Sequence, residues 1–250
     1  TDGIETSITL RPQSEGNRVS SDVWFEFFVY SVSEDNRWTE HCRGLISIDK
    51  SGADNTTADD ACLAADMEQC CTQEVPIGEF YERLAGLGLG YGPSFARMIS
   101  ARRAPFSPMQ TTGACVSRVA LPDIASIMPA GFQHPHSLHP AVLDSVLHSI
   151  FAAVGAESGH LRDPMVPVFM DSLYVSGAVP QQPSSTLSVY TSTKTTSTRH
   201  MQASLTVLDP GHPSNAVIRL GGLVCTKLAH DTIPQEYQGL SNTAYDLAWE

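Results

Sequence analysis

The first part of the chain, residues 1–49, alternates apolar and polar positions with the period of two that is typical of β-strands. Aromatic and β-branched side chains are frequent in these segments, and polar stretches that favour turns separate them. The pattern therefore predicts three strands, in the segments IETSITLRP, DVWFEFFVYSVS and RGLISID.

Residues 50–75 show no sustained period of either kind. The stretch is polar and acidic, and connecting segments of this length are usually exposed. We therefore predict a linker over residues 50–75.

A second folding unit is predicted over residues 76–230. Phe80, Leu84 and Leu87 recur at helical spacing, and the glycine-rich stretch at their end suits a helix C-terminus. A second, longer helix is predicted over residues 138–155. Strand patterns lie between and after the helices, in RMISARRAPF, TGACVSRVAL, MVPVFMDSLYVSGAV, STLSVYTSTKT, HMQASLTVLD and AVIRLGGLVCTKL.

One long helix among strands that look antiparallel indicates the α+β class, because parallel sheets require alternating strands and helices. The last segment, residues 231–250, is polar with scattered aromatic residues and suits an exit linker. The chain starts directly in a strand pattern without Met, which suggests a piece of a longer protein.

The long helix, LHPAVLDSVLHSIFAAVG, carries two polar side chains in an apolar sector. Asp144 and His148 share a narrow stripe with Phe151 and Gly155, and aliphatic residues flank that stripe. A carboxylate among apolar groups must pair or keep its proton, and a protonated carboxyl can serve as a general acid. His148, one turn further on, is close enough to hydrogen-bond Asp144, although the same pair would equally suit a structural role.

The stretch GLGLGYGPSF is rich in glycine but matches neither a dinucleotide-binding fingerprint nor a P-loop. The segment YGPSF predicts a tight turn, with Gly92 free in φ and Pro93 fixed. Such a turn would present Tyr91 and Phe95 to a cavity.

Composition excludes several classes of function. Hydrophobic residues make up 42% and charged residues 17% of the chain, which is typical of a globular protein, and the net charge of −12 argues against nucleic-acid binding. The sequence shows neither a secretory signal nor an apolar run long enough to span a membrane. The six cysteines have no zinc spacing, so we expect reduced thiols in a cytoplasmic protein.

The segment HPHSLHP places three histidines close together but has no carboxylate partner, so we predict no metal site there. Arg97, Arg102 and Arg103 form the only basic cluster of this acidic chain. The cluster is either an ordinary solvated surface or a docking surface for an acidic partner.

The two motifs together resemble a known family. YGPSF, followed some fifty residues later by LHPAVLDSVLH, is similar to the dehydratase domain of polyketide synthases, whose motifs are YGPxF and HPxxLDxxxQ/H. The amino-terminal phrases SSDVWFEFFVYS and WTEHCRGLI and the closing AYDLAWE resemble those of fungal highly reducing synthases. The resemblance implies a double hotdog, in which an antiparallel sheet wraps around a long central helix. Residues 1–49 would then be the last strands of an incomplete first hotdog, and residues 76–230 the second.

The resemblance also implies an activity. Such domains remove water from a β-hydroxyacyl thioester carried on an acyl carrier protein, without a metal or redox cofactor. Asp144 would be the catalytic acid, and His148 would position it. Further residues would bind substrate: Tyr91, Gly92, Pro93, Phe95, His139, Pro140, Val168 and Phe169. The expected partners are the carrier protein, docked at the arginine cluster, the neighbouring domains of the synthase and a second copy of the parent protein.

One part of the family pattern is absent. The base histidine belongs to an HxxxGxxxxP motif in the first hotdog, and no histidine of this chain fits that motif. We expect the base to lie upstream, so the chain alone should be inactive. Two alternatives stay open: a product-template domain that guides cyclisation, which the reducing-type phrases disfavour, and a non-catalytic scaffold within the synthase.

Overall fold

The computed structural model describes residues 4–14, 20–33, 35–49, 58–106 and 111–228. The chain divides into two compact units, one containing the described residues 4–49 and the other residues 58–228. The segment 231–250, expected as an exit linker, lies outside the described residues.

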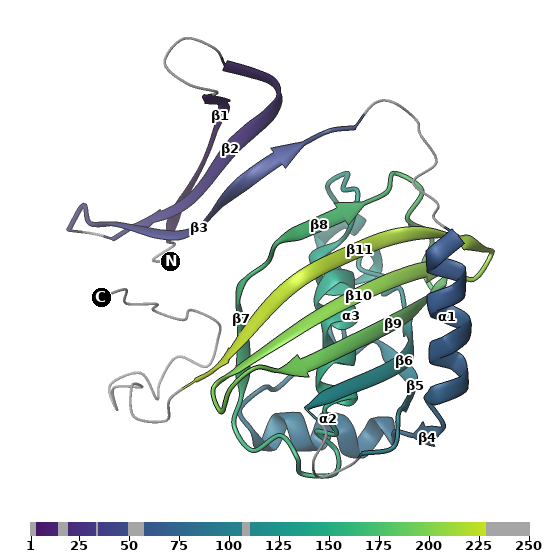
Figure 1. The fold of residues 1–250 in the computed structure, drawn as a ribbon. Helices are drawn as coiled ribbons and strands as arrows, with labels where there is room; N and C mark the ends of the chain where they lie inside the picture. Colours follow the sequence, from purple (N-terminus) through teal and green to yellow (C-terminus); the bar gives the residue numbers. More distant parts are fainter. Residues whose placement is uncertain (1–3, 15–19, 34, 50–57, 107–110, 229–250) are drawn as a thin grey trace. The chain divides into compact units, whose positions relative to one another are not determined.

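The first unit is a three-stranded antiparallel sheet (Figure 1). Strands β1 (Glu5–Ser14), β2 (Ser20–Val32) and β3 (Trp38–Ser47) follow one another in space as in sequence, which confirms the three predicted strands. Phe27 of β2 lies opposite Gly44, where a side chain would collide with the phenylalanine ring. The sheet has no covering helix among the described residues of this unit, and many of its apolar side chains are exposed.

The second unit is an eight-stranded antiparallel sheet that curves around one helix (Figure 1). The strands lie in the order β4-β5-β6-β9-β10-β11-β7, and β8 also pairs with β11. Because the sheet is antiparallel and encloses a helix, the predicted α+β class and hotdog fold are confirmed. The bounds are β4 (Gln73–Glu74), β5 (Met98–Arg103), β6 (Thr112–Ala120), β7 (Met165–Phe169), β8 (Ser172–Val175), β9 (Thr186–Thr195), β10 (His200–Asp209) and β11 (His212–Lys227).

The enclosed helix is α3 (Pro140–Ala153), which the sequence predicts over a slightly longer range. Its buried residues include both aliphatic side chains such as Val146 and Ile150 and the polar Ser145, His148 and Ser149. They face the main core, which β5, β6 and β9 supply from the concave side of the sheet. Among the described residues, no helix is long and apolar enough to cross a membrane.

Helix α2 (Ile77–Gly86) precedes the sheet and packs Phe80 and Leu84 into the core, as their spacing predicts. It ends in the expected glycine-rich cap. Gly88 has a φ of +90°, and the next amide, that of Leu89, donates to the carbonyl of Leu84 at 2.9 Å. This left-handed residue closes the helix and directs the chain towards the YGPSF turn. Two short 3₁₀ turns, η1 (Ala125–Ile127) and η2 (Pro129–Gly131), lead into α3.

The prediction of a linker over residues 50–75 is wrong for its second half, which forms helix α1 (Ala58–Cys70) and strand β4. The helix packs on the face of the sheet opposite α3, where Met67 and Cys71 contact Val116 and Tyr190. The apolar side of α1 is narrow, because alanine, cysteine and methionine supply most of it. The sequence of α1 therefore shows no clear helical period of hydrophobic residues. An ion pair between Asp60 and Arg219 of β11 helps to hold it in place.

All six cysteines are free, three exposed and three buried. Burial raises the pKa of Cys71 to about 12 and that of Cys225 to about 11, and it also raises the pKa of the fully enclosed Cys115. Alkylation requires the thiolate, so these three thiols should be inert in the folded chain.

We predict that iodoacetamide at about pH 8 modifies only the exposed cysteines, Cys42, Cys62 and Cys70. Peptide mass spectrometry reads out each site, and the same reaction in denaturant should modify all six thiols. Rapid modification of Cys115 in the native protein would contradict the packing of β6 against α3.

Candidate active site

Asp144 and His148 lie one turn apart on α3, and their side chains meet as the sequence predicts. The distance from His148 Nε2 to Asp144 Oδ2 is 3.2 Å. The exposed fraction of the side chain is 1% for His148 but 38% for Asp144. The expectation of a buried carboxyl is therefore wrong, although the carboxylate is paired.

The partial exposure of Asp144 has a structural cause. The rings of Tyr81 and Tyr91 pack against His148, with centroid distances of 5.6 and 3.9 Å. They enclose the imidazole and leave the carboxylate at the border of the apolar region. A helical period gives the direction of a side chain but not the point at which neighbouring layers stop covering it.

Tyr81 is a member of this site that the sequence analysis missed. Its hydroxyl lies 3.1 Å from His148 Nδ1 and accepts a hydrogen bond of 3.1 Å from the backbone amide of Met98. The available signal was its position beside Phe80 on an amphipathic helix, because a tyrosine hydroxyl that becomes buried normally finds a partner.

The pKa of Tyr81 rises from 10.0 to about 12, mainly because the phenol is buried. The negative charge of Asp144 raises this pKa further, whereas the Met98 amide and the positive charge of Arg97 lower it. The phenol therefore keeps its proton over the whole neutral range and remains a hydrogen-bond donor.

The segment YGPSF forms the predicted tight turn next to α3. The backbone amides of Phe95 and Ala96 both donate to the Gly92 carbonyl at 2.9 Å. The Ser145 hydroxyl of α3 lies 2.6 Å from the Phe95 carbonyl oxygen, which fixes the turn to the helix. Gly92 itself does not adopt a positive φ, so the turn does not use the conformational freedom that the sequence offers there.

The turn places its side chains as expected only in part. Tyr91 is half-buried and faces His148, whereas 40% of Phe95 is exposed. Gly92 and Pro93 are exposed as well. Of the four turn residues assigned to substrate binding, the structure brings Tyr91 directly to the Asp144–His148 pair.

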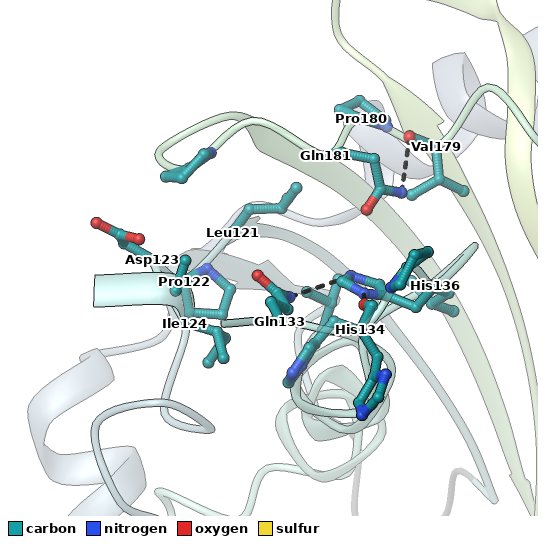
Figure 2. Close-up of a pocket in the computed structure, with 16 residues that line it drawn as sticks. Leu121, Pro122, Asp123, Ile124, Gln133, His134, His136, Val179, Pro180 and Gln181 are labelled. Atoms are coloured by element: carbon teal, nitrogen blue, oxygen red, sulfur yellow. Dashed lines mark hydrogen bonds between the residues drawn. The ribbon is translucent and has the colours of Figure 1, made fainter. Parts of the chain in front are cut away.

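A cavity of about 390 Å³ lies beside the start of α3 (Figure 2). His139 lines this cavity, but Asp144, His148 and Tyr91 do not. His139 is the N-cap of the helix, where its Nδ1 accepts from the Ala141 amide at 3.1 Å. Burial and the nearby His136 lower the pKa of His139, which favours the neutral ring that this cap requires.

The other residues assigned to substrate binding are less closely grouped. Pro140 is exposed one turn before Asp144, on the same side of α3. Val168 and Phe169 end β7, at an edge of the sheet, and 58% of Phe169 is exposed. Their part in substrate binding stays a prediction.

The three arginines do not form one docking surface, so that prediction is wrong. Arg102 and Arg103 are consecutive on β5, and consecutive side chains of a strand leave on opposite faces. Arg103 is 2% exposed and donates to Glu157 at 2.8 Å. Arg102 pairs with Glu68 of α1, and Arg97 donates to a backbone carbonyl at 3.1 Å.

Metal-binding geometry is not seen in the described part of the chain, where no three His, Cys, Asp or Glu side chains group around one point. The histidines of HPHSLHP form no such group either. His136 Nδ1 instead lies 2.9 Å from the backbone carbonyl oxygen of His134.

Comparison with known proteins decides the family. Residues 59–233 match the family described as the polyketide synthase dehydratase N-terminal domain. The chain belongs to the polyketide synthase dehydratase family. This dehydratase chain is 38% identical over 259 residues to the highly reducing polyketide synthase phiA of a fungal species, an alignment that covers 98% of the chain and 10% of the synthase. It thus spans about a tenth of the length of that curated relative.

Solved dehydratases share the fold of this dehydratase chain. An inactive His-to-Phe mutant of CurJ dehydratase, in complex with a compound, has a TM-score of 0.62 and 20% identity, covering 88% of this chain and 66% of that one. An inactive Asp-to-Asn mutant of CurK dehydratase has a TM-score of 0.60 and 20% identity. This match covers 89% of this chain and 67% of the CurK chain. At such identities the likeness shows the fold alone.

We predict that the buried phenol makes the stability of the chain sensitive to alkaline pH. In the unfolded chain Tyr81 loses its proton near its ordinary pKa of 10.0, whereas the folded chain holds it up to about 12. The unfolded state binds fewer protons in this window, so the free energy of unfolding falls as the pH rises.

The measurement is urea unfolding of wild type and Tyr81→Phe at about pH 9 and about pH 11. The stability advantage of wild type over the variant should shrink at the higher pH. Other tyrosines and thiols titrate in both proteins and cancel in the difference. A constant advantage across the two pH values would show that Tyr81 is not held protonated.

Proposed function

We propose that this dehydratase chain carries the acid half of an active site that removes water from a β-hydroxyacyl thioester. In this proposal Asp144 protonates the departing hydroxyl group, which leaves as water. A base removes the α-proton, and the electron pair of that C–H bond forms the double bond of the α,β-unsaturated thioester. The activity as a hydro-lyase rests on the family and on the geometry of Asp144.

The observation that carries the proposal is the asymmetry of the Asp144 carboxyl. Its Oδ2 lies 3.2 Å from His148 Nε2, whereas its Oδ1 makes no hydrogen bond within the described chain. When the carboxyl is protonated, an N–H donor at Oδ2 directs the proton to Oδ1. The acidic proton then stands on the open oxygen, where a substrate hydroxyl can reach it.

The base is proposed to be a histidine outside these 250 residues, because the motif HxxxGxxxxP does not occur among them. The inactive mutants of CurJ and CurK, one altered at a histidine and one at an aspartate, support a need for both residue types. The chain alone is then expected to be inactive. A non-catalytic scaffold is the alternative if the parent sequence carries no such histidine.

The proposed reaction consists of two proton transfers, which side chains can supply without a metal or redox cofactor. We propose that the substrate arrives on the phosphopantetheine arm of an acyl carrier protein. The length of phiA supports the presence of neighbouring domains in the parent synthase. A homodimeric parent and a cytoplasmic location complete the proposal.

We predict that Asp144→Asn in the parent synthase lowers kcat on a 3-hydroxyacyl N-acetylcysteamine thioester by about 100-fold or more, as expected for the loss of a general acid. The amide cannot donate an acidic proton but keeps the size of the side chain. Formation of the enoyl thioester is followed by ultraviolet absorbance and mass spectrometry. The 250-residue chain is assayed in parallel and should show no turnover.

Asp163→Asn is the matched control, because the Asp163 side chain is 39% exposed and pairs with Lys227. This variant should keep the wild-type rate. Equal rates for Asp144→Asn and wild type would refute the acid role, and full activity of the isolated chain would refute the external base.

A further inference from the structure

Four groups form one continuous line of hydrogen bonds that ends at Asp144. The Met98 amide donates to the Tyr81 hydroxyl, which lies 3.1 Å from His148 Nδ1. His148 Nε2 in turn lies 3.2 Å from Asp144 Oδ2. The line joins β5, α2 and α3, so it connects three separate elements to the carboxylate.

The proton positions follow from pairing each donor with an acceptor. The Met98 amide can only donate, so it occupies one lone pair of the Tyr81 oxygen. The phenol proton then has His148 Nδ1 as its acceptor, and the ring carries its own proton on Nε2. That proton points at Asp144 Oδ2. If Nδ1 carried the proton instead, it could only donate to the Tyr81 oxygen, which would leave the phenol proton without His148 as its acceptor and no donor facing the carboxylate.

The imidazole of His148 is enclosed, so each of its ring nitrogens needs a partner within the protein. The Tyr91 ring lies 3.9 Å from the imidazole, centroid to centroid, and His148 is buried on all sides. The charged groups near the line are Asp144 itself and Arg97, both of which act on Tyr81. The raised pKa of Tyr81, about 12, keeps its proton available to Nδ1.

We propose that Tyr81 is a positioning residue, which fixes the His148 tautomer and through it the orientation of the Asp144 carboxyl. The inference rests on the proposed function, since it gives the acid its geometry. Tyr81 touches neither the reacting atoms nor the open Oδ1. It acts by holding the Nε2 proton against Oδ2, so that the acidic proton stays on Oδ1.

The proposal predicts that glutamine can replace His148. A glutamine carbonyl can accept from the Tyr81 hydroxyl, and its amide can donate to Asp144. Methionine has a similar size and can do neither. A group that transferred protons itself could not be replaced by glutamine.

The test measures kcat and KM of the parent synthase with the 3-hydroxyacyl N-acetylcysteamine thioester. Tyr81→Phe should lower kcat at least tenfold and leave KM within about twofold. His148→Gln should keep kcat within about fivefold of wild type. His148→Met should lower kcat as much as Tyr81→Phe does. Tyr190→Phe is the matched control, because Tyr190 packs on the opposite face of the sheet. It should behave as wild type.

A double-mutant cycle separates positioning from a general packing effect. Tyr81→Phe should have little further effect on kcat in an Asp144→Asn background, because Tyr81 acts only through that carboxyl. An equal loss in both backgrounds would show a structural role and overturn the proposal. So would a Tyr81→Phe variant with wild-type kcat.

The two proposals fail in different ways. No turnover by the wild-type synthase would overturn the proposed function and the positioning role together. Turnover by wild type that depends on Asp144 but not on Tyr81 would overturn the positioning role alone. If Tyr81→Phe does not fold, His148→Gln and His148→Met still decide, because equal loss in both contradicts the hydrogen-bond line.

Discussion

A buried imidazole needs a partner for each ring nitrogen, and this requirement organises the second unit around His148. The ring is enclosed between α3, α2 and the YGPSF turn. Tyr81 satisfies Nδ1 and Asp144 satisfies Nε2, at 3.1 and 3.2 Å. An unpaired polar group in this core would cost about 1–3 kcal/mol. The packing of three elements and the orientation of one carboxylate are therefore consequences of the same constraint.

The hotdog fold explains why such a polar line can exist in an apolar core. The curved sheet covers α3, so polar side chains on its buried face must pair with carbonyls of the helix itself or with groups of the elements packed against it. Ser149 pairs with Thr191 of β9, and Ser145 with the Phe95 carbonyl. These contacts fix the rotation of α3 about its axis, and with it the direction in which Asp144 leaves the helix.

The sequence predicts the elements whose pattern is strong. The strands of both units alternate clearly, and α3 is recognisable from its length and its starting proline. The pairing of Asp144 with His148 follows from their spacing of four residues. Helix α1 escaped prediction because small residues and an ion pair hold it, and neither produces a hydrophobic period.

The remaining errors concern tertiary context. The exposure of Asp144 depends on where the cover of Tyr81 and Tyr91 ends, which no local pattern states. Tyr81 lies 67 residues from His148 in sequence, so its role needs the fold. The separation of Arg102 from Arg103 could have been foreseen, since a strand sends neighbouring side chains to opposite faces.

The protonation of His148 tests the central claim most directly. Nitrogen-15 NMR of the histidine-labelled chain distinguishes a protonated ring nitrogen from one that bears a lone pair. We expect a proton on Nε2, which faces Asp144, and a lone pair on Nδ1, which faces the Tyr81 hydroxyl. A ring with its proton on Nδ1 and a lone pair on Nε2 would contradict this expectation, because no donor would then face Oδ2 and the acidic proton of Asp144 would have no reason to stand on Oδ1.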